Sequence, residues 1–132
     1  MATIDLLVQG EIATLTLNNP DKLNAIDLAM WQQLAENMAN IGADRSIRCV
    51  VIRGAGEQAF AAGGDLEEFV TARATLEQAM HYHAQVAAAL NAIADCPHPT
   101  VALIRGACIG GGLEIAGVCD LRIAGESARF GA

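Results

Sequence analysis

Two glycine-rich segments hold the residues best suited to chemistry. They are Phe60-Ala-Ala-Gly-Gly-Asp65 and Gly110-Gly-Gly-Leu-Glu114, and each follows an apolar run typical of a strand. Glycine turns expose backbone N–H groups, which a site needs to stabilise a developing oxyanion. A nearby carboxylate can transfer a proton. Together the two segments indicate an acyl-transfer or enolate site, with Glu114 as its acid or base.

A structural explanation for Glu114 stays open beside the chemical one. A carboxylate in the first turn of a helix is stabilised by the helix macrodipole by about 0.3–1 kcal/mol. Its neighbours Leu113, Ile115 and Ala116 are apolar, so we expect the carboxylate to be partly desolvated. The glycines also have a structural explanation, because glycine commonly marks tight turns. Three glycines directly before a helix would instead present several N–H groups in one direction.

Other chemical patterns are weaker. Gly54-Ala-Gly-Glu-Gln-Ala59 fits a loose dinucleotide fingerprint, but Ala61-Ala-Gly-Gly64 interrupts the helix that this fingerprint requires. His81 and His83 are two positions apart in a predicted helix, so they point to nearly opposite faces and do not suit one metal ion. His98 lies between two prolines and is expected in a loop. No metal site is predicted.

Composition places the chain among folded globular proteins. Its 132 residues are 53% hydrophobic and 17% charged, and the net charge is −7 without any run of Lys or Arg. This argues against a nucleic-acid partner. The apolar stretch 99–119 contains Arg105, Glu114 and five glycines, which argues against a membrane span. The four cysteines show no C-x-x-C spacing and no signal peptide is recognised, so we expect a reducing, cytoplasmic compartment.

The elements that must position these segments alternate along the chain. Strands are predicted at 4–8, 12–17, 49–52, 101–104 and 121–124. One helix is predicted from the spacing of Leu28, Trp31, Leu34, Met38 and Ile41, with Asp27 as a candidate N-cap. A second begins with the capping box Thr75-Leu-Glu-Gln78, carries an apolar stripe of Leu76, Val86, Leu90 and Ile93, and ends before Pro97. A short helix is predicted over 112–118.

This order predicts one domain of the α/β class. A weak internal repeat supports it, because Ile52-Arg-Gly-Ala55 and Ile104-Arg-Gly-Ala107 both end a strand and lead through glycines toward a helix. No linker divides the chain.

These residues resemble the enoyl-CoA hydratase/isomerase (crotonase) superfamily. The similarity covers Leu17-Asn-Asn-Pro-Asp-Lys-Leu-Asn-Ala25, the segment 59–65, and Ile104-Arg-Gly-Ala-Cys-Ile-Gly-Gly-Gly-Leu-Glu114. It continues in Cys119-Asp-Leu-Arg-Ile-Ala124 and Ala128-Arg-Phe-Gly131. The resemblance implies a crotonase-like spiral of repeated β-β-α units, of which residues 1–132 would form the N-terminal portion of a single domain.

The resemblance also implies roles for individual residues. The N–H groups of Gly64 and Gly111 would form the oxyanion hole for an acyl-CoA thioester, and Glu114 would orient or deprotonate water. Most family members have alanine or another small residue at the position of Gly64. Residues that would contact coenzyme A are Lys22, Ala25, Ala62, Gly64, Asp65, Leu66 and Gly111. The side chain of Asp65 is equally suited to cap a helix, and we favour that role.

Family members are about twice as long as this chain. Their second catalytic acid would lie two positions beyond Ala132, and the C-terminal helices of the family's trimer are absent. The resemblance therefore implies a homotrimer or a hexamer for the full-length protein, and an uncovered apolar surface, poor solubility and no turnover for residues 1–132 alone.

Hydration of a trans-2-enoyl-CoA is the first functional hypothesis, motivated by the oxyanion pair together with Glu114. Isomerases of the superfamily often lack a glutamate matching Glu114, so its presence favours hydration without deciding between the two reactions. Coenzyme A is then part of the substrate, and no separate cofactor is expected. Isomerisation, dehydration of a hydroxyacyl-CoA such as carnitinyl-CoA, and a catalytically silent acyl-CoA binder stay open.

Overall fold

The computed structural model describes residues 2–132 and contains two parallel-rich sheets. The larger sheet has the order β1-β2-β3-β5-β7, formed by Thr3–Gln9, Ile12–Asn18, Cys49–Gly54, Thr100–Ile104 and Leu121–Ala124. β1 and β2 form an antiparallel hairpin, and the remaining neighbours are parallel. Burial alternates along β2 and β3, so one face of this sheet lies in the core. The five strands predicted from the sequence are confirmed to within two residues at each end.

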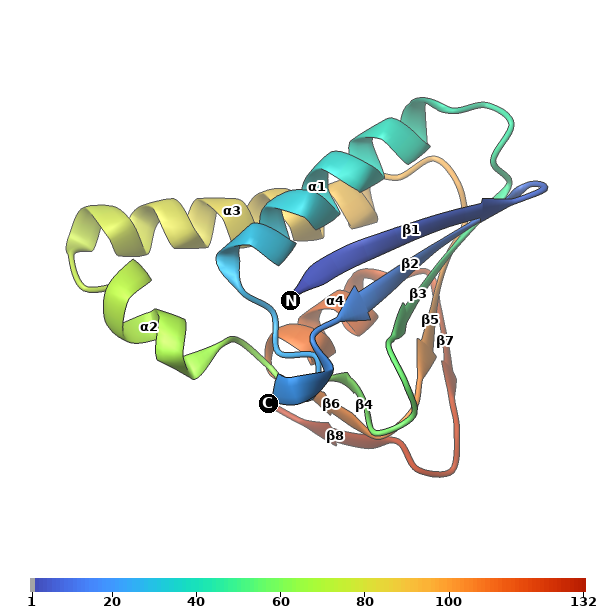
Figure 1. Cartoon of the computed structure of the whole chain (residues 1–132). Coiled ribbons are helices and arrows are strands. Elements are labelled where there is room, and N and C mark those ends of the chain that lie inside the picture. Colours follow the sequence, from blue (N-terminus) through green and yellow to red (C-terminus); the bar gives the residue numbers. More distant parts are fainter. Residues whose placement is uncertain (1) are drawn as a thin grey trace.

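A second, smaller sheet is formed by three short strands that were not predicted from the residue patterns. It consists of β4 (Ala59–Ala61), β6 (Ala107–Ile109) and β8 (Arg129–Gly131), which pair in parallel in that order. Each of its strands comes directly after a strand of the larger sheet, as Figure 1 shows for β3 and β4. The chain therefore folds as successive β-β units with helices between them.

The two copies of Arg-Gly-Ala sit where the chain passes between the sheets. A Cβ on Gly54 would collide with the backbone of Ala59, and a Cβ on Gly106 would collide with the backbone of Gln58. Gly106 also has a φ of +67°, which only glycine adopts readily. Glycine is required at both positions because the backbones approach closely there.

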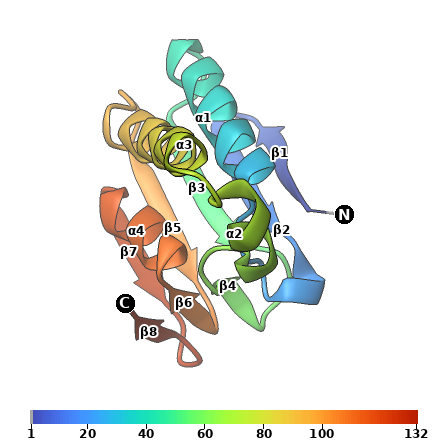
Figure 2. The ribbon, with the colours of Figure 1, turned by 90° about the vertical axis from the view of Figure 1, so that its left-hand side faces the viewer.

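Two long helices cover the core face of the larger sheet (Figures 1 and 2). They are α1 (Leu28–Ala43) and α3 (Leu76–Ala94). The predicted caps are confirmed: the side chain of Asp27 accepts from the N–H of Met30 at 2.8 Å, and Thr75 with Gln78 forms a capping box. All five residues of the predicted stripe on α1 except Leu28 are buried, and Leu28 packs against the core partly buried.

One residue of the stripe predicted for α3 is misplaced. Leu76 is 79% exposed, whereas Ile93 is buried and Val86 and Leu90 are partly buried. The physical reason is that the N-terminal end of α3 projects beyond the sheet (Figure 1), so an apolar side chain there has nothing to pack against within residues 2–132. The helical period was correct, but the sheet does not reach its first turn.

Three shorter helices complete the fold. A 3-10 helix covers Pro20–Lys22, α2 covers Leu66–Ala72 and α4 covers Gly111–Val118. α4 contacts both sheets and α3. The expected helix at 112–118 is confirmed and begins one residue earlier. None of the helices in the described part of the chain is long and apolar enough to cross a membrane.

Candidate active site

The two glycine segments meet in space although 46 positions separate Gly64 from Gly110. Two backbone hydrogen bonds to Ile26 hold the first segment in place. The N–H of Ile26 donates to Gly63 O at 2.8 Å, and its carbonyl accepts from the N–H of Asp65 at 3.3 Å. The second segment lies directly against the first: a Cβ atom added to Gly110 would be only 3.6 Å from the Cα of Gly63. The parallel pairing of β4 and β6, which precede the two segments, brings them together.

Gly64 and Gly111 present the donors expected of an oxyanion hole. Gly111 is the first residue of α4, where N–H groups have no partner inside the helix. Within residues 2–132, neither the Gly64 N–H nor the Gly111 N–H takes part in a hydrogen bond. Both residues line one cavity of about 190 Å³, which Glu114 also lines. Two glycines with unpaired N–H groups, one of them at a helix N-terminus, and a glutamate therefore line the same space.

The surroundings of Glu114 differ from the sequence prediction. Its side chain is exposed, so the expected partial desolvation does not occur in this chain. The neighbours Ile115 and Ala116 are fully buried, but they project from other sides of α4 than Glu114 does. Adjacent positions of a helix point about 100° apart, and apolar neighbours in sequence therefore do not bury a helical carboxylate.

An aromatic cluster, Phe69 with Tyr82, forms another wall of this cavity. Their rings make an edge-to-face contact with centroids 6.0 Å apart, and the guanidinium of Arg73 lies 4.5 Å from the centre of Phe69 and 4.7 Å from that of Tyr82. Such cation–π contacts favour keeping the cation in place. Burial, helped by the nearby charge of Glu68, raises the pKa of the Tyr82 phenol above its ordinary value.

Sequence reasoning missed this cluster. Phe69 and Arg73 are four positions apart across the end of α2, and Tyr82 comes from α3, so no motif links the three. The i, i+4 spacing of Phe69 and Arg73 was the one available signal. Of the two histidines considered, His83 lines the cavity and lies 3.3 Å from Arg73, whereas His81 does not line it. His98 lies in a loop, as expected, and hydrogen-bonds to Ile41 O at 3.0 Å.

A second cavity, of about 440 Å³, adjoins the first through Gly64. The residues predicted to contact coenzyme A line it, apart from Gly111, which lines the smaller cavity; they are Lys22, Ala25, Ala62, Gly64, Asp65 and Leu66. The predicted residues, which lie between positions 22 and 66, therefore share one space. The side chain of Leu66 is 75% exposed at its edge, which leaves apolar surface available to a ligand.

Charges at this cavity are arranged around Lys22. Its Nζ lies 3.0 Å from Asp65 Oδ2 and 3.0 Å from Glu67 Oε2. The hydrogen bond from Lys22 lowers the pKa of the Asp65 carboxyl, and the same bond raises the pKa of Lys22. Asp65 also accepts from the N–H of Glu67 at 3.1 Å, which confirms the expected N-cap of α2. Its side chain is thus a structural link between the 3-10 helix and α2.

The comparison with known families establishes which family the chain belongs to. The family model described as enoyl-CoA hydratase/isomerase matches residues 8–132. The chain belongs to this enoyl-CoA hydratase/isomerase family.

Solved structures confirm the crotonase fold. The chain is similar to an enoyl-CoA hydratase/carnithine racemase from Magnetospirillum magneticum, with 51% identity and a TM-score of 0.95 over 99% of this chain and 49% of the other.

Curated relatives of the family differ in the reactions that their names give. An (E)-benzylidenesuccinyl-CoA hydratase of Thauera aromatica is 37% identical over 97% of this chain and 49% of its own length. A mitochondrial Delta(3,5)-Delta(2,4)-dienoyl-CoA isomerase of Mus musculus is 33% identical over 92% of this chain and 40% of its own length. The chain spans about half the length of the curated relatives it matches.

Proposed function

We propose that the protein hydrates a trans-2-enoyl-CoA to a 3-hydroxyacyl-CoA. One observation carries this proposal: Gly64 and Gly111, whose N–H groups are unpaired within residues 2–132, line the same cavity as Glu114. Two donors can stabilise the oxyanion and one base can activate water, which are two of the tasks that addition of water to a conjugated thioester requires. The naming of several relatives as CoA-thioester hydratases supports the choice.

Each group has a defined task in the proposed reaction. The thioester oxygen accepts hydrogen bonds from the N–H groups of Gly64 and Gly111. Glu114 takes a proton from water as the water oxygen bonds to the β-carbon, and the electron pair of the double bond moves through the α-carbon onto the thioester oxygen. The α-carbon then takes a proton from the second catalytic acid that the resemblance implies, and the carbonyl re-forms. Release of the proton from Glu114 to solvent and uptake of one by that acid restore the site, so the net change is addition of one water molecule. Loss of one oxyanion donor typically costs about 10²–10³ in rate.

The neighbouring cavity is suited to the coenzyme A part of the substrate. It opens beside Gly64, so a thioester held at Gly64 would extend its coenzyme A chain along Ala62, Leu66 and Lys22. The exposed apolar side chain of Leu66 favours contact with the pantetheine chain, and Lys22 supplies a cation for a phosphate. A homotrimer or hexamer and a reducing, cytoplasmic compartment are further parts of the proposal; the four free cysteines fit the latter.

The decisive experiment is the substitution Glu114→Gln in the complete protein. We expect hydration of a short trans-2-enoyl-CoA to fall by at least about 10², because the amide is no longer a base. Glu36→Gln is the matched control, since Glu36 is an exposed carboxylate on α1 that lines neither cavity. Near-normal hydration by the Glu114→Gln variant would refute the role given to Glu114.

Double-bond isomerisation is the second candidate, favoured by the similarity to the dienoyl-CoA isomerase. An isomerase would move the double bond of a 3-enoyl-CoA without adding water, so mass spectrometry of the product separates the two reactions. A silent acyl-CoA binder would bind the thioester in calorimetry and convert neither substrate.

A further inference from the structure

The repeated Arg-Gly-Ala sequence places two arginines side by side outside the candidate active site. Arg53 is on β3, and Arg105 comes directly after β5, the parallel neighbour of β3. Leu103 is the register partner of Arg53. Because Ile52 and Ile104 are buried against the helices, strand alternation puts Arg53, Leu103 and Arg105 on the opposite face of the sheet.

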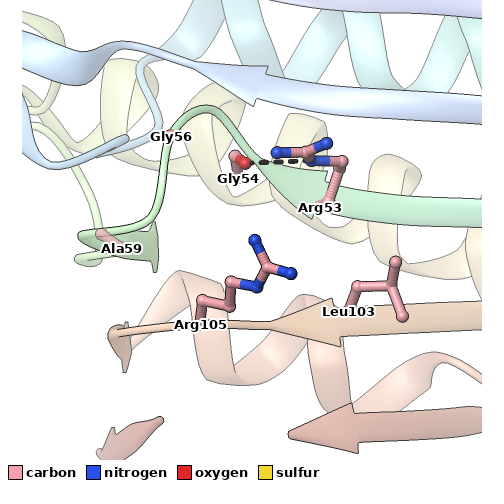
Figure 3. Close-up of a pocket in the computed structure, with 6 residues that line it drawn as sticks. All are labelled: Arg53, Gly54, Gly56, Ala59, Leu103 and Arg105. Carbon is pink, nitrogen blue, oxygen red and sulfur yellow. Dashed lines mark hydrogen bonds between the residues drawn. The ribbon is translucent and has the colours of Figure 1, made fainter. Parts of the chain in front are cut away.

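Both arginines line one small cavity. Its volume is about 70 Å³, and Gly54, Gly56, Ala59 and Leu103 form the rest of its wall. Figure 3 shows the guanidinium of Arg105 extending toward the end of β3, where the guanidinium of Arg53 lies. Neither arginine lines the cavities around Gly64, so this pocket is separate from the candidate active site.

The positive charge of this pocket is poorly compensated by the chain itself. Within residues 2–132, Arg53 makes no ion pair, and its Nε donates to the carbonyl of Gly54 at 3.3 Å. Arg105 has one partner, Glu57, at 3.5 Å, and both of these side chains are largely exposed. An exposed pair of this kind contributes little to stability. Two guanidinium groups therefore converge in a protein whose net charge is −7.

We propose that Arg53 and Arg105 form a binding site for a small phosphate-type oxyanion, taken from solution and not from coenzyme A. Guanidinium groups donate to such anions through paired N–H groups in a fixed planar fork. A tetrahedral oxyanion can accept from two forks that arrive from two strands through separate oxygens, whereas a carboxylate has to share its two oxygens between them. The cavity volume of about 70 Å³ is of the size of one such ion.

The test is calorimetric titration with inorganic phosphate, at constant ionic strength set with chloride. We expect one bound phosphate in the wild type, and affinity reduced about tenfold or more in Arg53→Gln and in Arg105→Gln, because each removes charge-assisted hydrogen bonds. Arg45→Gln is the matched control, since Arg45 is exposed on another loop and lines none of these cavities. It removes the same charge and should leave the affinity within about twofold.

Loss of binding in the arginine variants could also result from misfolding, so a variant that is expected to bind more tightly is needed, and this variant is Glu57→Gln. It removes the carboxylate that competes for Arg105, so it should tighten phosphate binding severalfold. Absence of saturable binding in the wild type, or equal weakening in Arg45→Gln, would overturn the proposal. Equal affinity for acetate would overturn the assignment to a tetrahedral ion. Displacement of phosphate by coenzyme A would instead assign the arginines to the acyl-CoA site.

Discussion

The packing of Phe69 over Gly64 leads to a prediction about the stability of the glycine segment 60–65. A methyl group added by Gly64→Ala would lie 2.7 Å from Cζ and 2.9 Å from Cε1 of the Phe69 ring. Non-bonded carbon atoms prefer about 3.5–4.0 Å, so the ring must move by roughly 1 Å. That movement is opposed by the edge-to-face contact with Tyr82 and by the guanidinium of Arg73 above the ring.

Two opposing contributions set the magnitude. Overpacking of this kind costs about 1–3 kcal/mol. The backbone of Gly64 lies outside the left-handed region, so alanine can adopt its conformation. Alanine also lowers the conformational entropy of the unfolded chain, which stabilises the folded protein by about 0.4–1 kcal/mol. We therefore expect Gly64→Ala to lower the free energy of unfolding by about 1 kcal/mol. In a Phe69→Leu background, where the outer ring atoms are gone, the same change should be neutral or stabilising.

The assay is urea unfolding of the wild type, both single variants and the double variant. Because the cost of Phe69→Leu appears in both arms of the cycle, it cancels, and the coupling energy reports the contact itself. We expect a coupling of about 1–2 kcal/mol, taken from the overpacking cost. An equal effect of Gly64→Ala in both backgrounds would show that Phe69 does not restrain the loop, and would refute the reasoning.

Two further predictions concern titrating groups. The folded-state pKa of Asp65 is lowered by Lys22, so its contribution to stability is present above its unfolded pKa of about 4 and is lost as the pH falls through the folded value. Asp65→Asn should therefore flatten the decline in unfolding free energy between about pH 5 and pH 2, and parallel curves for the two proteins would contradict this. Burial raises the thiol pKa of Cys108 and of Cys119 to about 11. Iodoacetamide at pH 8 should therefore first label the half-buried pair, Cys49 and Cys96, as read by peptide mass spectrometry, and equal labelling of all four would contradict it.

Features that depend on residues close together in the chain could be predicted from the sequence. The stripe on α1, the cap at Asp27 and the capping box at Thr75 depend on residues within a few turns of one another, and the structure has them as predicted. The glycine segments were also recognisable, because glycine clusters at strand ends mark special backbone geometry wherever the chain goes afterwards.

Features that depend on contacts between residues far apart in the sequence could not be predicted from it. The exposure of Leu76 follows from where the sheet ends, and that of Glu114 from which side of α4 packs against its neighbours. The contact of Phe69 with Gly64 joins α2 to a loop. Each of these depends on two elements whose mutual position is set by the core and not by local preference.

The sequence by itself determined the strands of the larger sheet, the helices α1, α3 and α4, the family, and which glycines and which carboxylate were candidates for chemistry. Only the tertiary structure decided that Gly64 and Gly111 share a cavity with Glu114, that aromatic rings and Arg73 enclose it, and that Arg53 and Arg105 converge on another face. The physical reason is that local propensities act over a few residues, whereas parallel pairing of β3 with β5 and of β4 with β6 joins positions about 50 residues apart.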